Sequence, residues 1–345
     1  MDDGKRIRQR ATMLDIAELS GTSLKTVSRV FNKVATVDPI LVAKVQEAAK
    51  KVGYTPNMNA ASLRGKSGKT LSIGILLEDI SNPFSAALHR AYEIYARKHN
   101  YIVLAASLEE DPLFERELVN AFISRRVDGL IIAPSNTDHS YLEIEQKTGI
   151  HFGFIDRPAS NFSVDTVLST NRESATFAVE HLMNHGHRNI AFIHNSLIYT
   201  GKERFSGYKT ALKKARIPLN RDFVLTDNGT ATDTLIELRD MMLSNNPPTA
   251  IFSAKNSSTV LAVRTLKELN LENKIALIGF DDVPGGDLFS PAVSVLMQDV
   301  AQLGLRSAQL LFSRIEGHTG PAVVERIPTK FIARGSGEIR PQERK

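Results

Sequence analysis

The chain has 345 residues, of which 42% are hydrophobic and 23% charged, a composition ordinary for a globular protein of two or three domains. No apolar run reaches the roughly 18 residues that a membrane-spanning helix needs. The N-terminal MDDGKRIRQR lacks the apolar segment of a secretory leader, so we expect a cytoplasmic protein. The absence of cysteine excludes disulfides, thiol catalysis and thiolate metal sites. Residues 1–69 hold 13 Lys and Arg against 6 Asp and Glu, and such a basic segment predicts contact with a polyanion.

Residues 13–32, MLDIAELSGTSLKTVSRVFN, predict two short helices joined by a tight turn. Apolar residues recur there at helical spacing, at Leu14, Ala17, Val27 and Val30. Gly21 suits the turn, and Ser23 is an N-cap for the second helix. The outward face of that helix would carry Leu24, Lys25, Ser28, Arg29 and Asn32. Such a polar and cationic face is typical of a helix-turn-helix that reads DNA, although a helical hairpin with a solvated face is the alternative.

The rest of the N-terminal region predicts a third helix and a connecting segment. Thr12 caps the first helix, and Asp38 with Pro39 begins the third, which ends at Gly53. Its apolar residues would complete a three-helix core: Ile40, Val42, Val45, Ala48, Ala49 and Val52. The first ten residues are either an arm that contacts phosphate or a frayed terminus. Residues 54–65 are either a plain linker or a hinge helix that orders on DNA and inserts Leu63 into the minor groove.

From Thr70 the pattern changes to alternating buried strands and amphipathic helices. Strands are predicted at 71–77, 101–107, 128–135, 151–156, 189–195, 223–226, 249–254, 275–282 and 293–299, with a strand pair near 322–333. Helices are predicted near 84–99, 112–126, 140–148, 171–185, 201–215, 231–244, 257–270 and 301–316. This alternation is typical of parallel sheets covered on both faces, and two such series predict two similarly built lobes.

Ligands of such sheets bind outside the carboxyl ends of the strands. The rule selects residues 79–84, Asp156, the 195–204 loop, residues 254–257 and the pair Asp281 and Asp282. These positions are rich in carboxylate, guanidinium, amide and aromatic groups, which is the mixture that a sugar requires.

The chain resembles the LacI/GalR family of bacterial transcription regulators. Seven segments match in order: TMLDIAELSGTSLKTVSRVFN, GYTPNMNAASLR, DISNPF, VDGLIIAPS, GHRNIAFI, the T-x-x-x-R-x-x-G-Y pattern from Thr200 to Tyr208, and LIGFDD. The resemblance covers about residues 11–335 and implies an all-α helix-turn-helix headpiece on an α/β periplasmic-binding-protein-like body of two doubly wound parallel-sheet lobes. It also implies a homodimer that binds a near-palindromic operator and takes a small carbohydrate-type effector in the cleft, with no cofactor and no catalytic activity.

The resemblance implies specific site residues and domain limits. Matching DNA-binding positions are Thr12, Ser23, Leu24, Lys25, Thr26, Ser28, Arg29, Asn32, Tyr54, Asn57 and Leu63. Matching effector-binding positions are Asn82, Pro83, Phe84, Asp156, Thr200, Arg204, Phe252, Lys255, Asp281 and Gln298. Arg204 and Asp281 are expected to clamp adjacent hydroxyls as a pair. The expected domains are a headpiece of residues 1–56, a hinge of 57–69, an N-lobe of 70–164 and 296–327, and a C-lobe of 165–295 and 328–340.

Two positions depart from the family pattern. Ala61 stands where the hinge commonly carries arginine, so one DNA contact is in doubt. Lys255 lies in Ala254-Lys255-Asn256, where relatives commonly carry Asn-Asp. One interpretation is an anionic effector, either a sugar acid or a phosphorylated sugar or nucleoside. The other is that Lys255 pairs with a lobe carboxylate such as Asp156, or points to solvent.

Two other classes of function remain as alternatives. A sugar receptor of transport or chemotaxis type would use the same body, but it needs a leader and no DNA reader. An enzyme is disfavoured because no G-x-G-x-x-G follows the first strand and there is no P-loop or G-x-S-x-G elbow. His185 and His187 lack a third metal ligand in the sequence pattern, and Asp281 and Asp282, as neighbours at a strand end, would point apart.

Overall fold

The computed structural model describes residues 11–32, 34–54, 69–135 and 138–342. The chain divides into two compact units, Met1–Thr70 and Leu71–Lys345. The small unit contains the helices α1 (Met13–Ser20), α2 (Leu24–Phe31) and α3 (Pro39–Val52). Its core holds Ile16, Ala17, Val27, Val30, Val45, Ala48 and Ala49.

Two residues that the spacing placed in this core lie at the surface. Leu14 is 64% exposed and Ile40 is 65% exposed. Each is the second residue of its helix. Ile16, which is fully buried, fills the place that the spacing gave to Leu14.

The first lobe of the large unit is a parallel sheet in the order β11-β5-β4-β3-β1-β2. Its strands are β1 (Ser72–Leu77), β2 (Ile102–Ser107), β3 (Gly129–Ile132), β4 (His151–Ile155), β5 (Asp165–Ser169) and β11 (Val324–Ile327). One face packs on α5 (Pro83–Lys98) and α12 (Val300–Ile315), and the other on α6 (Pro112–Ser124) and α7 (Leu142–Lys147). Within β1, Ile73 and Ile75 face α5 whereas Leu76 faces α6, as the alternation of a doubly covered strand requires.

The second lobe repeats this plan with the strand order β12-β10-β9-β8-β6-β7. Its strands are β6 (Ile190–His194), β7 (Val224–Thr226), β8 (Ala250–Ser253), β9 (Ala276–Phe280), β10 (Ser294–Met297) and β12 (Lys330–Ile332), of which β12 runs antiparallel to β10. The helices α8 (Asn171–Asn184) and α9 (Tyr199–Lys214) cover one face. The helices α10 (Ala231–Leu243) and α11 (Asn256–Glu268) cover the other. Short 3-10 turns lie at Arg221–Phe223 and Ser336–Glu338.

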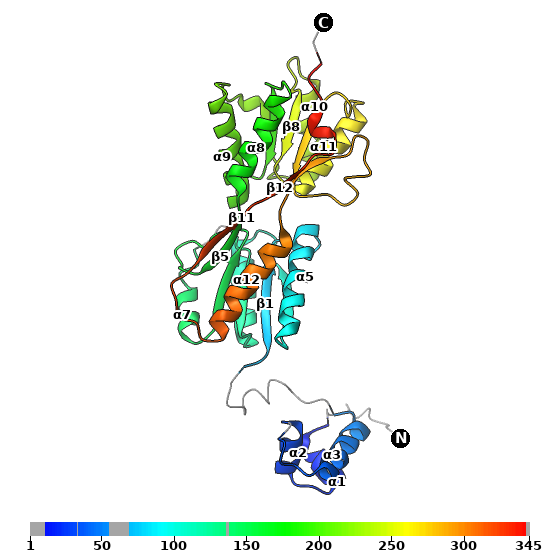
Figure 1. Ribbon diagram of the computed structural model, residues 1–345, viewed down its shortest axis with the longest axis vertical. Helices are drawn as coiled ribbons and strands as arrows, with labels where there is room; N and C mark the ends of the chain where they lie inside the picture. The colour runs from blue at the N-terminus through cyan, green and yellow to red at the C-terminus, as the bar shows by residue number, and fades with distance from the viewer. Residues whose placement is uncertain (1–10, 33, 55–68, 136–137, 343–345) are drawn as a thin grey trace, which may run out of the picture. The chain divides into compact units, whose positions relative to one another are not determined.

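The chain crosses between the lobes three times: after β5, after β10 and after β11 (Figure 1). The first lobe therefore takes α12 and β11 from the end of the chain. No helix in the described ranges is long and apolar enough to span a bilayer.

The sheet topology corrects the sequence prediction at four points. The sequence pattern missed β5, because DTVLS contains only two large apolar residues. Since β5 pairs with β4, the first lobe extends past the predicted limit at residue 164. β10 pairs with β9 through Leu296, so the predicted return to the first lobe at residue 296 is also too early. The strands near 322–333 do not pair with each other, because β11 joins the first sheet and β12 the second.

Candidate functional site

The second helix of the small unit presents a polar face that its own residues hold in place. Val27 and Val30 are buried, which turns the opposite side of α2 outward. At its start, the Ser23 hydroxyl accepts a 3.1 Å hydrogen bond from the Thr26 backbone N–H and lies 2.9 Å from the Thr26 hydroxyl. This is an N-cap, as the sequence predicts. Ser23 and Thr26 thus fix the beginning of the helix.

The outward face carries the groups that the sequence placed there. Lys25, Arg29 and Asn32 are exposed, Ser28 is half-buried, and Leu24 is 49% exposed. The Arg29 guanidinium donates a 2.7 Å hydrogen bond to the Thr36 hydroxyl. The Asn32 amide donates to the Ser28 hydroxyl at 3.4 Å. The face therefore offers cationic, amide and hydroxyl groups to an external ligand.

Other predicted DNA contacts have structural partners or lie outside the described residues. The Thr12 hydroxyl and backbone N–H both donate to Asp15, at 2.8 and 2.7 Å, so Thr12 caps α1. Tyr54 is half-buried and its ring packs on Phe31 at a centroid separation of 5.2 Å. Asn57, Ala61 and Leu63, with the hinge segment that contains them, lie outside the described residues.

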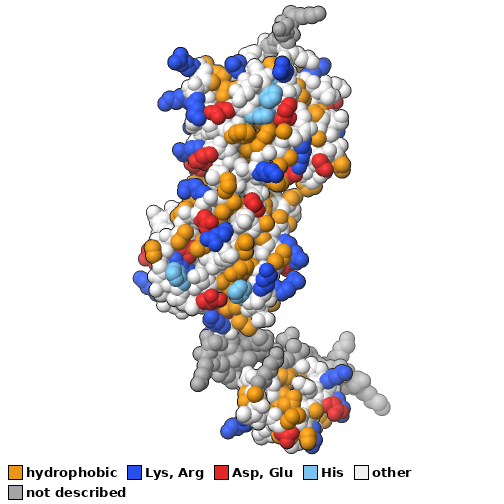
Figure 2. Space-filling model, viewed as in Figure 1, with side chains coloured by type: hydrophobic (Ala, Val, Ile, Leu, Met, Phe, Trp, Pro, Cys, Tyr) orange, Lys and Arg blue, Asp and Glu red, His pale blue; other side chains and the backbone are white. Residues whose placement is uncertain are grey.

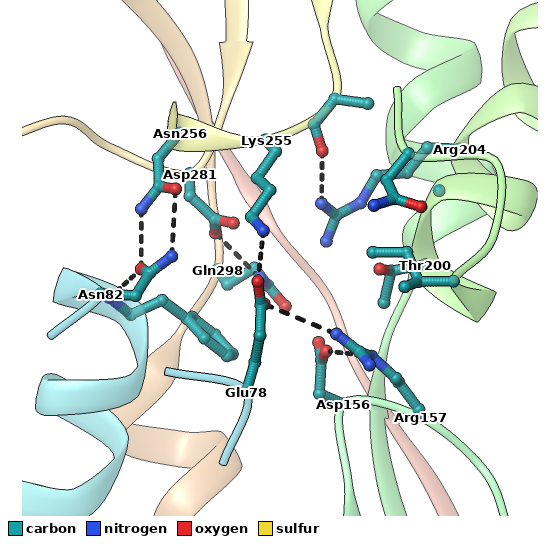
Figure 3. Close-up of a pocket in the computed structure, with 15 residues that line it drawn as sticks. Glu78, Asn82, Asp156, Arg157, Thr200, Arg204, Lys255, Asn256, Asp281 and Gln298 are labelled. Carbon is teal, nitrogen blue, oxygen red and sulfur yellow. Dashed lines mark hydrogen bonds and ion pairs between the residues drawn. The ribbon is translucent and has the colours of Figure 1, made fainter. Parts of the chain in front are cut away.

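A polar cleft lies between the two lobes of the large unit, at the carboxyl ends of the strands (Figure 3). The segments after β1 and β4 line it from the first lobe, and those after β6, β8 and β9 from the second. Its lining residues are Glu78, Asn82, Phe84, Asp156, Arg157, Asn195, Ile198, Thr200, Gly201, Arg204, Ala254, Lys255, Asn256, Asp281 and Gln298. The free space is about 40 Å³, which is room for roughly three water molecules. A sugar would need the lobes or side chains to move.

Eight of the ten predicted effector residues line this cleft, and Pro83 and Phe252 do not. Pro83 is exposed at the first position of α5. Phe252 is fully buried in β8 and packs against Phe192, with 5.4 Å between ring centroids. The strand alternation turns Phe252 toward α8 and α9, so its placement in the cleft was wrong.

The sequence pattern missed two charged residues in the cleft, Glu78 and Arg157. Glu78 precedes the selected range 79–84 by one residue, and Arg157 follows the selected Asp156 by one. The rule that selects residues at the carboxyl ends of strands could have found both. It missed them because a sequence pattern locates the end of a strand only to within about a residue.

Arg204 is buried and held on three sides. Its Nε donates to the Asn171 side chain at 2.8 Å, and its Nη1 donates to the Ala254 carbonyl at 2.6 Å. The guanidinium carbon lies 3.5 Å from the centre of the Phe280 ring. Burial lowers the pKa of Arg204, and the charges of Asp281 and Asp156 oppose that effect. No ion pair joins Arg204 to Asp281 among the described residues, so the expected clamp is two separately held groups.

Asp281 is a half-buried acceptor in a constrained backbone. Its φ is +67°, in the left-handed region that a residue other than glycine seldom adopts. The Gln298 amide donates to its carboxylate at 2.8 Å. Burial raises the pKa of Asp281 to about 6, although Arg204 and Gln298 act in the opposite direction. The neighbouring Asp282 points elsewhere, to Arg334 at 2.6 Å, as the sequence analysis expected of adjacent strand-end residues.

Arg157 is the centre of a charged cluster in the first lobe. Its guanidinium donates to both oxygens of Glu110 at 2.5 Å and to the Pro134 carbonyl at 3.1 Å. It also lies 3.5 Å from Glu78 and 3.5 Å from Asp156. Burial works against the charge of Arg157, but these partners more than compensate and raise its pKa.

An ion pair and a pair of side-chain amides cross the cleft from lobe to lobe. The Lys255 ammonium pairs with the Glu78 carboxylate, and the Asn82 and Asn256 side chains donate to each other, at 3.4 and 2.9 Å (Figure 3). Of the interpretations left open by the sequence, Lys255 follows the one in which it pairs with a lobe carboxylate, although that carboxylate is Glu78 and Asp156 lies beside Arg157. Lys255 is thus already paired within the chain.

Comparisons with known proteins agree with this architecture. The family model "Bacterial regulatory proteins, lacI family" matches residues 12–57, and the model "Periplasmic binding protein-like domain" matches residues 179–337. The chain is 33% identical to EndR of Paenibacillus polymyxa over 312 residues, which is 88% of this chain and 91% of EndR. It is 31% identical to the ribose operon repressor of Halalkalibacterium halodurans over 332 residues, which is 94% of this chain and 96% of the repressor.

Solved structures show the same fold. A LacI family transcriptional regulator from Enterococcus faecium with bound ribose has a TM-score of 0.70 at 25% identity, covering 79% of this chain and 100% of that chain. The lac repressor dimer bound to operator has a TM-score of 0.82 at 23% identity, covering 95% of this chain and 99% of that chain, a likeness of fold. Since both parts of the chain match and the full-length relatives exceed 30% identity, the chain belongs to the LacI family of bacterial regulatory proteins.

Proposed function

We propose that this family member is a cytoplasmic, non-enzymatic repressor that binds a near-palindromic operator as a homodimer and responds to a small carbohydrate-type effector. The observation that supports this most is the combination, in one chain, of a capped helix with a polar outer face and a two-lobed body with a polar cleft. The ribose operon repressor of Halalkalibacterium halodurans is a relative over nearly its whole length, which supports regulation by a similar route.

The DNA-reading role rests on α2. Lys25 and Arg29 are exposed cations on one helix face, and Leu24 beside them offers apolar contact to a thymine methyl group. Ser23, Thr26 and Asn32 would contact phosphates or support the helix. Thr12 and Tyr54, which have structural partners, would add backbone contacts, and Asn57 and Leu63 would act from the hinge.

The effector role rests on the cleft. Asp156, Asp281 and Asn82 are acceptors for hydroxyl groups, and Arg204 is a fixed donor. Phe84 adds an aromatic surface for the C–H face of a sugar ring. Thr200 and Gln298 complete the polar lining.

Contacts in the cleft reach the lobe crossings, which supports coupling to DNA binding. Gln298 follows β10 at the second crossing, and its amide oxygen accepts a hydrogen bond from Ser169 at the first. Asn171, just beyond the first crossing, accepts from Arg204. An effector that touches Asp281 and Arg204 would therefore bias the geometry of both crossings. By linkage, operator DNA would change effector affinity by the same factor.

The homodimer is supported by an apolar surface on the first lobe. β2 is an edge strand, and its Ile102 is 62% exposed. Ile94 of α5 is 47% exposed and Leu305 of α12 is 36% exposed. Hydrophobic side chains gather over α5 and α12 in Figure 2. An exposed edge strand with apolar neighbours invites a second copy of the chain.

Operator selection tests the proposal. The full chain would select duplexes from a random-sequence pool, and fluorescence anisotropy would then measure the affinity for the enriched sequence. We expect a near-palindromic sequence whose binding weakens steeply with salt. Arg29→Ala should weaken binding at least about tenfold, whereas Lys44→Ala, an exposed lysine on α3, should change it little. Enrichment of no sequence, or equal effects of the two variants, would contradict the proposal.

A thermal-shift screen would then test the effector class. The panel holds pentoses, hexoses, sugar acids, sugar phosphates and nucleosides, because a ligand of the folded state raises the melting temperature. A hit must also change operator affinity in the anisotropy assay. A compound that shifts melting without changing operator affinity would favour the alternative, a sugar receptor without regulatory coupling.

A further inference from the structure

Lys255 is a cation that lines the cleft from the second lobe. It follows β8 and precedes α11, so its backbone is fixed at the cleft edge of the second lobe. Its side chain extends across the cleft to Glu78 after β1 of the first lobe (Figure 3). The two side chains are 24% and 22% exposed, so water screens their attraction only in part.

Glu78 links Lys255 to the charged cluster of the first lobe. Behind Glu78 lies Arg157 at 3.5 Å, and behind Arg157 lies Glu110 at 2.5 Å. The four side chains form a row in which cations and carboxylates alternate. Asp156 adds a further carboxylate beside Arg157. Lys255 and Arg157 each already face at least one carboxylate, so neither of these two cations is left over for an anionic ligand.

The charged side chains that line the cleft also balance in number. Glu78, Asp156 and Asp281 are opposed by Arg157, Arg204 and Lys255. An anionic ligand would add an unmatched negative charge to a partly desolvated space, which is costly. An uncharged ligand would leave the balance intact.

A second contact crosses the cleft next to the ion pair. Asn82 and Asn256 exchange hydrogen bonds between their amides. Each amide oxygen also accepts a local backbone hydrogen bond, Asn82 from the Phe84 N–H at 3.0 Å as the N-cap of α5, and Asn256 from the Ser257 N–H at 2.7 Å. These local hydrogen bonds hold each side chain in one conformation, so little side-chain entropy is lost when the two amides come into contact. Separating the lobes at the α5 and α11 ends would break both crossing contacts together.

We propose that Glu78 and Lys255, assisted by the Asn82–Asn256 pair, form a latch that closes the cleft and makes it selective for uncharged polyhydroxyl effectors. This rests on the proposed function, because it specifies the ligand of the same cleft. Lys255 acts as the partner of Glu78, and the effector binds through Asp281, Arg204 and neighbouring polar groups. The latch gives the closed form stability that does not depend on the ligand.

The distance between the lobes tests the latch without DNA or effector. The chain has no cysteine, so Ala87→Cys on α5 and Val260→Cys on α11 would place two spin labels at exposed positions on either side of the cleft. Double electron–electron resonance measures their separation. We expect Lys255→Gln and Glu78→Gln each to shift the distance distribution to longer distances. The double variant should shift it no further than either single variant does. Lys274→Gln, an exposed lysine of the same lobe, is the matched control. An unchanged distribution in both variants would overturn the latch.

The charge of the ligand tests the selectivity. The probes are D-glucose with D-gluconate and D-glucuronate, and D-ribose with ribose 5-phosphate, each measured by thermal shift and calorimetry. The wild type should bind an uncharged probe at least about tenfold more tightly than its anionic counterpart. Glu78→Gln frees Lys255 and should raise affinity for the anionic counterpart about tenfold. Preference of the wild type for an anion, lost in Lys255→Gln, would overturn the selectivity. Operator binding by the same variants, measured separately, reports on the proposed function alone.

Discussion

The two lobes share one architecture but use it differently at the cleft. In each lobe, an aspartate follows a central strand with a left-handed backbone, at φ +65° for Asp156 and +67° for Asp281. In each, that backbone N–H donates to the next strand, to Val167 and to Leu296. Asp156 then lies beside the cation Arg157, whereas desolvation at Asp281 raises the pKa of that carboxyl to about 6. The same turn thus places one carboxylate beside a cation and leaves the other, Asp281, with a raised pKa.

The largest loss of stability should come from replacing Arg157, which belongs to the charged cluster of the first lobe. Replacing it with methionine leaves Glu110, Glu78 and Asp156 close together without their shared cation. We expect the free energy of unfolding to fall by about 3–5 kcal/mol, the range for breaking one side of a buried ion pair. Urea unfolding of the full chain measures this. An effect below about 1 kcal/mol would show that the carboxylates regain solvent and that the cluster is not needed for stability.

A glycine-to-alanine substitution at a helix contact should lower the free energy of unfolding by a smaller amount, which differs between the two lobes. Gly207 on α9 lies against the α8 backbone, where an added Cβ would overlap the Arg172 carbonyl and come within 2.7 Å of Ala175. Gly304 on α12 lies against α5, where the nearest atom is the Ala91 side chain at 2.5 Å. Gly207→Ala should cost about 1–3 kcal/mol because backbone yields poorly. Gly304→Ala should cost less, because only the Ala91 Cβ lies within 3.0 Å of the added Cβ, whereas three atoms of α8 do so at Gly207. Equal losses in chemical denaturation would contradict this ranking.

The pH dependence of effector binding should follow Asp281. Below pH 6 its carboxylate becomes protonated and loses an acceptor for ligand hydroxyls, so affinity should fall by up to about tenfold per pH unit between pH 6 and 5. Calorimetry with the best sugar of the panel measures this. Asp281→Asn should remove the dependence, and Asp156→Asn should keep it. A raised carboxyl pKa costs stability above pH 6 and nothing below pH 3.8, so Asp281→Asn should also gain relative stability as pH rises.

The smallest effect is expected at exposed ion pairs. Arg90 and Glu93 on α5 are 58% and 37% exposed in their side chains, and Lys214 and Glu180 of the second lobe are 62% and 39% exposed. Arg90→Ala and Lys214→Ala should each change stability by less than about 1 kcal/mol. They also serve as controls for Arg157→Met. A larger loss at one of them would reveal a difference between the lobes that burial does not explain.

Much of this fold follows from local patterns, and the exceptions have physical causes. Helical caps such as Ser23 and Asp38 bond to residues close by in the chain, so their roles could be predicted from the sequence. The short strand β5 was not, because its pairing with β4 and β11 supplies what its composition lacks. Phe252 was misplaced by alternation along a strand whose orientation only the packed sheet determines.

The charge partners in the cleft were the hardest to foresee. Lys255 was noticed as a departure, but its partner Glu78 lies in the other lobe, far away in the chain. Glu110 similarly reaches Arg157 from a different loop. Such contacts depend on how distant segments come together in the folded chain. The spacing of apolar residues along the sequence carries no information about that.

The three crossings have a consequence for synthesis on the ribosome. The strands β1 to β5 emerge early, but α12, which packs on Leu88 and Tyr92 of α5, emerges only after the strands β6 to β10 of the second lobe. Until then the nascent first lobe carries a bare apolar face and lacks its last strand, β11. A premature stop codon before Val300 therefore yields two incomplete lobes rather than one finished lobe. We expect chaperones to bind such a fragment and proteases to degrade it.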